Sequence, residues 1–172
     1  MKSIVVLSDT HHSLDNRFSN YFKNADEIWH AGDIGSLTVT DKLNKYAVLR
    51  AVSGNIDNYK IKTIFKPYIY FKCEDVKIIM THIGGYPGKY AKKTITLINQ
   101  YNPDLFVCGH SHILKVMYDK KYNLLHMNPG SIGDEGQHKV KTLLSFIIDK
   151  HEIKNLKVIE FPRLKKSTNS IC

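Results

Sequence analysis

Short hydrophobic runs alternate with polar loops along the first third of the chain. Residues 4–7, 27–30 and 47–52 are rich in aliphatic and aromatic side chains, and each run ends in a polar or glycine-containing turn. Runs of this length and composition are typical of buried strands. Residues 16–22 and 37–46 lie between them and have the spacing of short amphipathic helices. This alternation predicts an α/β fold that begins with a largely parallel sheet.

The second half of the chain is richer in predicted strands. We place a helix over residues 89–101, because Asn102 and Pro103 would end it. The strands are predicted at 68–71, 77–81, 105–108, 115–118, 124–127, 143–148 and 158–161. Together these elements predict a two-layered sheet core flanked by helices. Since no internal repeat or linker interrupts the pattern, we expect one domain over residues 1–161, followed by a basic tail over residues 162–172.

Composition narrows the class of protein only a little. The chain has 172 residues, of which 42% are hydrophobic, and 25 Lys and Arg against 16 Asp and Glu give a formal net charge of +9. These values exclude a disordered or low-complexity chain, and the positive charge favours anionic partners such as nucleotides and phosphate esters. No apolar run approaches the ~20 residues of a membrane helix, and polar residues interrupt the N-terminus before a signal peptide could form. We therefore expect a soluble, cytoplasmic protein whose cysteines, Cys73, Cys108 and Cys172, are free thiols.

Metal-binding residue types recur directly after the predicted strands. They are Asp9, His11, Asp33, Asn55, His82, His110 and His112. Because ligands bind beyond the carboxyl ends of the strands in open α/β sheets, we expect these side chains to meet at one edge. Nitrogen and oxygen donors without thiolates suit Mn, Fe, Co, Ni or Zn. These donors are too many for one tetrahedral ion, so they predict two divalent ions that share a carboxylate.

One residue separates Asp9 from His11, and one separates His110 from His112. In an extended segment alternate residues face the same side, so both members of each pair are expected to reach the metal site. His12 would then face the other way, either into solvent or toward substrate.

The motifs around these residues occur in a characteristic order. They are Asp9-Thr10-His11, Gly32-Asp33, Gly54-Asn55-Ile56-Asp57, Thr81-His82, Gly109-His110-Ser111-His112 and Asn128-Pro129-Gly130-Ser131. As a complete set they resemble the calcineurin-like metallophosphoesterase superfamily, and within it the small YfcE-like phosphodiesterases. The resemblance extends over residues 4–146 and implies two mixed β-sheets packed as a sandwich with flanking helices.

The resemblance also implies a role for each ligand. The first ion would be held by Asp9, His11 and His112, the second by Asn55, His82 and His110, and Asp33 would bridge both. The expected function is a di-metal-dependent phosphodiesterase in which a hydroxide that bridges the ions attacks phosphorus, without a protein nucleophile. Mn²⁺ is the first expectation for the metal, with Fe, Ni, Co or Zn as alternatives. A phosphomonoesterase or nuclease that uses the same centre stays open, as does a metal-binding scaffold without turnover, because a retromer subunit with this fold serves in assembly.

Two departures from the family pattern bear on the substrate. Many relatives carry Gly-Asp-x-x-Asp-Arg, but residues 32–36 of this chain lack the second Asp and the Arg. Relatives with nuclease or phosphatase activity often have a His where this chain has Ile56. That His commonly assists the leaving group, so a substrate with a good leaving group or another proton donor would be required.

The remaining candidates each have two interpretations. His30 and Asp57 either orient a metal ligand or only pack and fix a turn, and His126 and His138 are interpreted as ordinary surface or strand histidines. The glycine-rich segment 84–89 is expected to enter a helix and either to contact an anionic substrate or only to form a tight turn. Residues 128–131 are expected to form a turn. The expected partner is a small phosphodiester or nucleotide; nucleic acid and self-association stay open, and a membrane is not expected.

Overall fold

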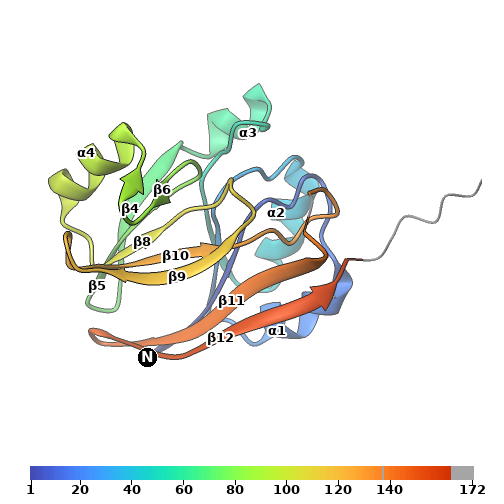
Figure 1. The fold of residues 1–172 in the computed structure, drawn as a ribbon. Helices are drawn as coiled ribbons and strands as arrows, with labels where there is room; N and C mark the ends of the chain where they lie inside the picture. The colour runs from blue at the N-terminus through green and yellow to red at the C-terminus, as the bar shows by residue number, and fades with distance from the viewer. Residues whose placement is uncertain (137, 164–172) are drawn as a thin grey trace, which may run out of the picture.

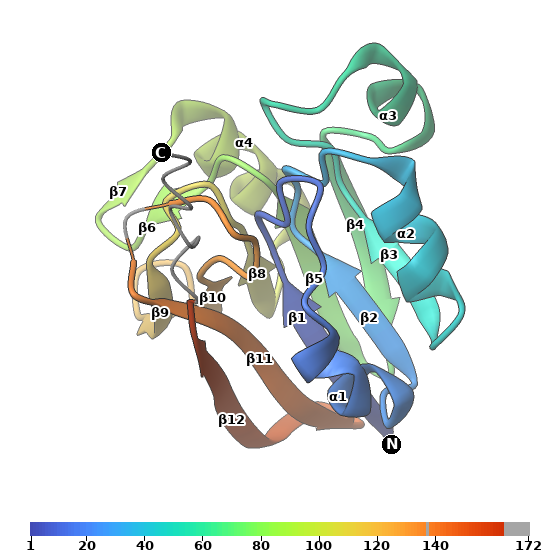
Figure 2. The same ribbon diagram turned by 90° about the vertical axis from the view of Figure 1, so that its right-hand side faces the viewer.

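Two mixed five-stranded sheets pack face to face in the computed structural model, which describes residues 1–136 and 138–163 (Figures 1 and 2). The first sheet has the order β12-β11-β1-β2-β3 and consists of β1 (Lys2–Leu7), β2 (Glu27–His30), β3 (Val48–Ala51), β11 (Val140–Asp149) and β12 (Glu152–Pro162). The second has the order β4-β5-β8-β10-β9 and consists of β4 (Tyr68–Cys73), β5 (Val76–Thr81), β8 (Leu105–Val107), β9 (Leu114–Asp119) and β10 (Leu124–Pro129). The predicted α/β fold with two packed sheets is therefore confirmed.

Helices cover the outer faces of both sheets, so the fold has four layers. The helical elements are the 3₁₀ turn η1 (Asn16–Phe18), α1 (Ser19–Lys23), α2 (Leu37–Asn44), α3 (Tyr59–Ile64) and α4 (Lys92–Tyr101). The alternation of side chains in β1 explains the layering: Ile4 and Val6 belong to the core between the sheets, whereas Val5 and Leu7 pack toward η1, α1 and α2. A third cluster joins α4 to the second sheet.

The parallel strands of each sheet direct their carboxyl ends to the same side of the molecule. β1, β2 and β3 are parallel neighbours, as are β5, β8 and β10. The loops after β1, β2, β3, β5 and β8 carry the residues that the sequence predicts as ligands. Backbone hydrogen bonds join these loops, for example from Asp9 N to the Gly32 carbonyl (3.0 Å) and from Gly109 N to the His82 carbonyl (3.0 Å).

The helix predicted over residues 89–101 starts three residues later in the structure, at Lys92. Gly85–Tyr86 (β6) and Lys89–Tyr90 (β7) instead form a small hairpin, and α4 starts at Lys92. Pro87 and Gly88 occupy the two central positions of its turn, and Gly88 has a φ of +88°. Proline followed by a glycine with positive φ is the signature of a type II turn. The expectation that the glycine-rich segment leads directly into a helix is therefore wrong.

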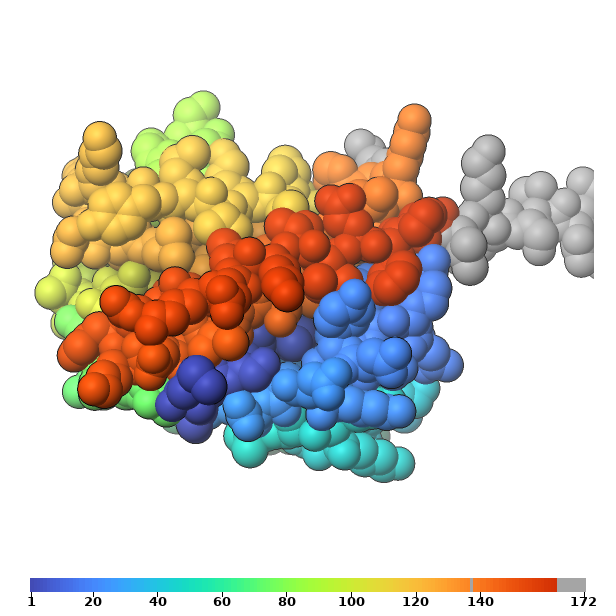
Figure 3. Space-filling view, turned by 90° about the horizontal axis from the view of Figure 1, so that it is seen from below, coloured from blue at the N-terminus to red at the C-terminus, as the bar shows by residue number. Residues whose placement is uncertain are grey.

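Three further elements differ from the sequence prediction. The helix α3 was not predicted, although the Asn58 side chain caps it by accepting a hydrogen bond from Ile61 N (3.1 Å). The strand β12 is much longer than the predicted residues 158–161. Most of its side chains are exposed at the edge of the sheet, so the sequence has no apolar pattern that would predict the rest of the strand. Figure 3 shows β12 as an orange-red band across one face of the molecule. Asn128 and Pro129 end strand β10, so the predicted turn begins only at Gly130 (φ +78°).

The C-terminal part of the described chain is tied to the sheet. Pro162 is the last residue of β12, and Arg163 N donates to the Lys139 carbonyl at 2.8 Å. The rest of the predicted basic tail, together with Cys172, lies outside the described residues, and the single domain over residues 1–161 stays a prediction. Within residues 1–136 and 138–163, no helix is long and apolar enough to cross a membrane.

Candidate metal centre

The backbone at the candidate site adopts a conformation that L-residues rarely take. Five of the seven predicted ligands have a positive φ, namely Asp9 (57°), His11 (44°), Asp33 (54°), His110 (71°) and His112 (58°). The expectation of extended segments at these pairs is therefore wrong. Left-handed backbone at non-glycine residues costs about 1–3 kcal/mol each and clusters at functional sites. Tight turns, and not the two-residue period of a strand, bring these side chains together.

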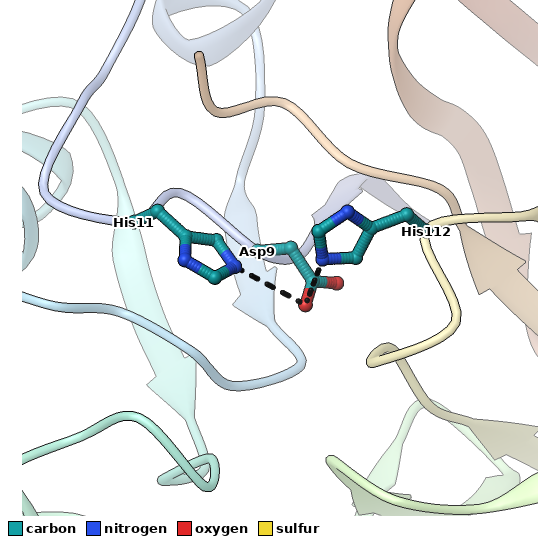
Figure 4. Close-up of side chains that lie close together, drawn as sticks. All are labelled: Asp9, His11 and His112. Carbon is teal, nitrogen blue, oxygen red and sulfur yellow. Dashed lines mark ion pairs between the residues drawn. The ribbon is translucent and has the colours of Figure 1, made fainter. Parts of the chain in front are cut away.

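Asp9, His11 and His112 form a first cluster (Figure 4). One ligand atom from each residue lies within 4.8 Å of the other two. Asp9 Oδ1 is 3.2 Å from His112 Nε2 and 4.0 Å from His11 Nε2. The other oxygen, Asp9 Oδ2, accepts a hydrogen bond from the backbone N of His110 (3.1 Å). Oδ1 is thus the oxygen that faces the two imidazoles, and it also lies 4.0 Å from His82 Nε2.

Asp33, His82 and His110 form a second cluster, which Asn55 joins. His82 Nε2 is 3.2 Å from Asp33 Oδ1 and 3.0 Å from Asn55 Oδ1. On the opposite side of the ring, His82 Nδ1 donates to the Ala31 carbonyl (2.8 Å). A neutral His82 in this tautomer presents a lone pair to two oxygens, so three acceptors converge on one point. A cation at that point, either a proton or a metal ion, would relieve the repulsion between these acceptors.

Asp33 lies between the two clusters. Its Oδ1 faces His82, and its Oδ2 is 3.7 Å from His11 Nε2. Burial raises the pKa of this carboxyl, but the hydrogen bond and charge of His82 and the backbone N–H of Ile56 (3.1 Å) hold it below its usual range. A Cβ at Gly54 would overlap Asp33 Oδ1, so the loop after β3 can approach the carboxylate only with glycine at that position.

The donors of both clusters fit divalent cations. Asp9 Oδ1 and His11 Nε2 are buried and have no hydrogen-bond partner among the described residues. A buried polar atom without a partner costs about 1–3 kcal/mol. With metal–ligand bonds of about 2.0–2.2 Å, two donors on one ion lie roughly 3–4 Å apart. The spacings of 3.2 and 4.0 Å at Asp9 Oδ1 agree with that geometry.

Comparison with known proteins decides the family. Residues 1–151 match the model of the calcineurin-like phosphoesterase superfamily domain. The chain belongs to this superfamily. It is 32% identical over 136 residues to a probable metallophosphoesterase of Methanocaldococcus jannaschii, with 74% of this chain and 67% of that protein covered. It is also 29% identical to a probable metallophosphoesterase of Mycoplasma genitalium, over 97% of this chain and the whole of that protein.

Solved structures confirm the calcineurin-like fold. Vps29 of Entamoeba histolytica has a TM-score of 0.73 at 17% identity, with 93% of this chain and 98% of that chain covered. A predicted phosphoesterase of Streptococcus pneumoniae has a TM-score of 0.67 at 23% identity, with 94% and 98% covered. At these identities the likeness shows the fold alone.

Buried hydrogen bonds tie the ligand loops of this phosphoesterase domain together. Gly32 N donates to His30 Nδ1 (3.2 Å), so His30 Nε2 carries the proton and donates to Thr10 Oγ1 (2.9 Å), which in turn donates to the Ile34 carbonyl (2.9 Å). Burial lowers the pKa of His30 to about 4, so the ring is neutral near pH 7. His30 is thus a packed histidine that joins the loops after β1 and β2, and among the described residues its ring forms no hydrogen bond with a predicted ligand side chain.

Asp57 joins the loops after β2 and β3. Its Oδ1 accepts a hydrogen bond from Gly35 N and its Oδ2 from Gly54 N, both at 2.7 Å. Among the described residues no imidazole donates to this carboxylate, so its interpretation as an orienter of a histidine ligand is wrong. The carboxylate stabilises the backbone that carries Asp33 and Asn55.

Sequence reasoning assigned no role to two residues that support the ligand loops, Asn128 at the loop after β8 and Glu135 at the loop after β1. Asn128 Nδ2 donates to the Gly109 carbonyl (2.9 Å) and to Ser111 Oγ (3.1 Å). Glu135 places Oε2 3.3 Å from His11 Nδ1, on the side of the ring away from the cluster. The motif around Asn128 was a signal for its contacts with the loop after β8. Nothing in the sequence indicated the contact between Glu135 and His11, because these residues lie far apart in the chain.

The other histidines lie outside the clusters. His12 and His138 are exposed. His126 is not an ordinary surface residue: it is buried in β10, both of its ring nitrogens lack a hydrogen-bond partner among the described residues, and burial lowers its pKa to about 4.

One cavity borders the metal centre, and a second borders the loop between His110 and His112. One has a volume of about 420 Å³ and is lined in part by Asn55 and His82 of the second cluster. The other has a volume of about 250 Å³ and is lined in part by Ser111, which lies between His110 and His112, and by Asn128. The larger cavity falls in the usual size range of small-molecule sites, roughly 300–1,000 Å³.

Proposed function

We propose that this metal-dependent phosphoesterase is a dinuclear phosphodiesterase that hydrolyses small phosphodiesters. The position of Asp33 between the two clusters carries the proposal, because one carboxylate oxygen of Asp33 faces His82 and the other faces His11. One divalent ion is assigned to Asp9, His11 and His112, a second to Asn55, His82 and His110, and both to Asp33.

Divalent ions bound there would polarise a phosphoryl oxygen and offset the negative charge that develops on phosphorus. The chain's own contribution is positioning. Strained turns and buried hydrogen bonds fix the donors before a ligand arrives, which lowers the entropic cost of binding. No side chain is assigned as the nucleophile.

The two cavities favour a diester over a monoester. A diester has a substituent on either side of phosphorus, and one cavity borders Asn55 and His82 whereas the other borders the loop of His110 and His112. Each cavity offers space for one substituent. Ile56, in place of the histidine of many relatives, leaves protonation of the leaving group without an assigned donor, which favours substrates with acidic leaving groups.

Mn²⁺ is the metal that we propose to test first. A zinc complex of Vps29 from Entamoeba histolytica, with a TM-score of 0.71 and 16% identity over 94% of this chain and 98% of that chain, supports the capacity of the fold to hold a divalent ion. The nitrogen and oxygen donors are compatible with Mn, Fe, Co, Ni and Zn.

The test compares hydrolysis of bis-(p-nitrophenyl) phosphate with that of p-nitrophenyl phosphate, first in chelator and then in Mn²⁺. The p-nitrophenolate leaving group needs no general acid, so the assay isolates the metal centre. We expect Mn²⁺-dependent cleavage of the diester and little cleavage of the monoester. Asp33→Asn should lower kcat about 100-fold or more, since it removes the charge between the two clusters.

Asp41→Asn is the matched control, because Asp41 is exposed on α2. Calorimetric titration with Mn²⁺ counts the bound ions in each variant. Wild-type turnover by Asp33→Asn at full metal occupancy would refute the shared role of Asp33. Binding of two ions without turnover of either ester would refute the enzyme and favour a metal-binding scaffold.

A further inference from the structure

The larger cavity has a marked positive character. Among the described residues that line it, Lys62 and Lys93 are the charged ones apart from the metal-centre histidine, and none is acidic. Lys62 comes from α3 and Lys93 from α4, so two separate elements deliver a cation to the same cavity. Both side chains therefore line a space that opens directly onto the second cluster.

Neither lysine forms an ion pair with another described residue, although Lys93 Nζ lies 6.0 Å from the centroid of the Tyr68 ring. The ion pairs of the described residues involve other cations, such as Lys2, Lys77 and Lys141, and not Lys62 or Lys93. Lys62 Nζ donates to the backbone carbonyl of Asn55 at 3.3 Å, which places the ammonium group beside a predicted metal ligand. An anion in the cavity could therefore contact both ammonium groups without breaking an existing salt bridge.

The position of Lys93 is unfavourable for the helix itself. It is the second residue of α4, and the first turn of this helix contains no acidic residue and has no side-chain cap. Cations at a helix N-terminus oppose the helix dipole, whereas an anion there is favourable. The helix therefore adds to the positive potential that the two lysines create, and local helix stability does not account for a lysine at this point.

We propose that the larger cavity binds a second anionic group of the substrate, so that the preferred substrates are phosphodiesters in which one substituent carries a further phosphate. The proposal rests on the proposed phosphodiesterase function and adds the class of substituent. The reacting phosphate lies at the metal centre, and the further phosphate lies between Lys62 and Lys93. Nucleotides with a second phosphate have this chemistry.

A matched pair of substrates isolates the second phosphate. Thymidine 5′-(p-nitrophenyl phosphate) and its 3′-phosphorylated derivative release the same p-nitrophenolate from the same bond and differ only in the additional phosphate. We expect the wild-type protein in Mn²⁺ to prefer the 3′-phosphorylated substrate by about tenfold in kcat/KM, mostly through KM. In the double variant Lys62→Gln/Lys93→Gln the preference should fall to about onefold to twofold.

The control double variant Lys121→Gln/Lys157→Gln removes the same charge from exposed sites outside the cavity. It should keep the tenfold preference. The control double variant should also hydrolyse bis-(p-nitrophenyl) phosphate at the wild-type rate. For Lys62→Gln/Lys93→Gln the readout is the ratio between the two thymidine substrates, because any general effect on the metal centre cancels in that ratio.

Calorimetric binding gives a readout that does not need turnover. Thymidine 3′,5′-bisphosphate should bind the Mn²⁺-loaded protein about tenfold more tightly than thymidine 5′-phosphate, and only the Lys62/Lys93 variant should lose the difference. Turnover of bis-(p-nitrophenyl) phosphate without discrimination in either assay would refute the anion site and leave the phosphodiesterase standing. Discrimination in binding without any turnover would refute the phosphodiesterase and uphold the anion site.

Discussion

Asp57 tests whether the metal centre depends on residues that do not touch a metal. Its buried carboxylate accepts two backbone hydrogen bonds at 2.7 Å, from Gly35 on one loop and Gly54 on another. Asp57→Asn keeps the shape of the side chain. The amide can accept from only one of the two N–H groups, however, and its NH₂ opposes the other. The substitution thus removes one charge-assisted hydrogen bond and leaves a buried donor without a partner.

The size of the effect follows from these two losses. A hydrogen bond to a charged group contributes about 1.5–3 kcal/mol, and an unpaired buried donor costs about 1–3 kcal/mol. Since the loops can relax in part, we expect the free energy of unfolding to fall by about 3 kcal/mol. In a domain of this size that corresponds to a decrease in Tm of roughly 6–12 °C. Asp33 and Asn55 lie on the loosened loops, so Mn²⁺ affinity should fall about 10- to 100-fold.

Urea denaturation of the metal-free protein measures stability, and calorimetric titration with Mn²⁺ measures affinity. Asp41→Asn makes the same chemical change at an exposed position and should alter neither. An Asp57→Asn variant whose unfolding free energy and Mn²⁺ affinity both match wild type would refute the role of Asp57 in joining the loops. A loss of stability with unchanged affinity would show that the ligands hold their geometry without this tie.

Two further substitutions test the packing at the site and the charges behind it. Gly54→Ala places a Cβ on Asp33 Oδ1, so we expect the free energy of unfolding to fall by about 1–3 kcal/mol and most of the Mn²⁺-dependent turnover to be lost. The control Gly88→Ala, in the open hairpin turn, should keep the wild-type turnover. Equal activity of the two variants would contradict this argument. Glu27 is buried, and although burial raises its pKa, hydrogen bonds from Arg50, Lys2 and Trp29 lower it to about 2. The difference from the ordinary value of 4.5 corresponds to at most about 3 kcal/mol of stability, which is present above pH 4.5 and is lost as the pH falls toward 2. Urea denaturation at pH 7 and pH 3 should therefore show that Glu27→Gln is less stable than wild type at pH 7 and closer to it at pH 3, and a difference that does not depend on pH would count against the charge.

The layered architecture could be predicted because burial is recorded in the sequence. The buried run of β1 and the alternation of Ile4 and Val6 with Val5 and Leu7 report two apolar faces. By contrast, β12 lies at the edge of its sheet with mostly exposed side chains, so only its pairing with β11 defines it. Pro87 and Gly88 were a local signal for the turn of the β6–β7 hairpin. The hairpin was not predicted because residues 89 and 90 were assigned to the following helix.

The ligand types could be predicted from their positions after strands, but the geometry of the site could not. A positive φ at Asp9 or His110 has only a weak signature in residue type, since Asp and His adopt it more often than other non-glycine residues but do not require it. It is imposed by contacts between segments far apart in the chain, such as the hydrogen bond from His110 N to Asp9 Oδ2. The contact between Glu135 and His11 likewise joins segments far apart in the chain. Local patterns therefore identified the donors, whereas tertiary contacts determine how they converge.

The separation between cores and site has a functional consequence. The three hydrophobic clusters consist mostly of strand and helix side chains, and only a few loop residues such as Ile34 and Cys108 join them. Most of the apolar packing therefore does not involve the ligand loops. The strained turns persist because buried hydrogen bonds of His30, Asp57 and Asn128 stabilise the loops that contain them. A protein built in this way can lose its donors and keep its fold, which is why the likeness to Vps29 cannot establish catalysis and the donors themselves must. In this chain the strained turns and the buried, unpartnered Asp9 Oδ1 and His11 Nε2 are costs that a bound cation would offset.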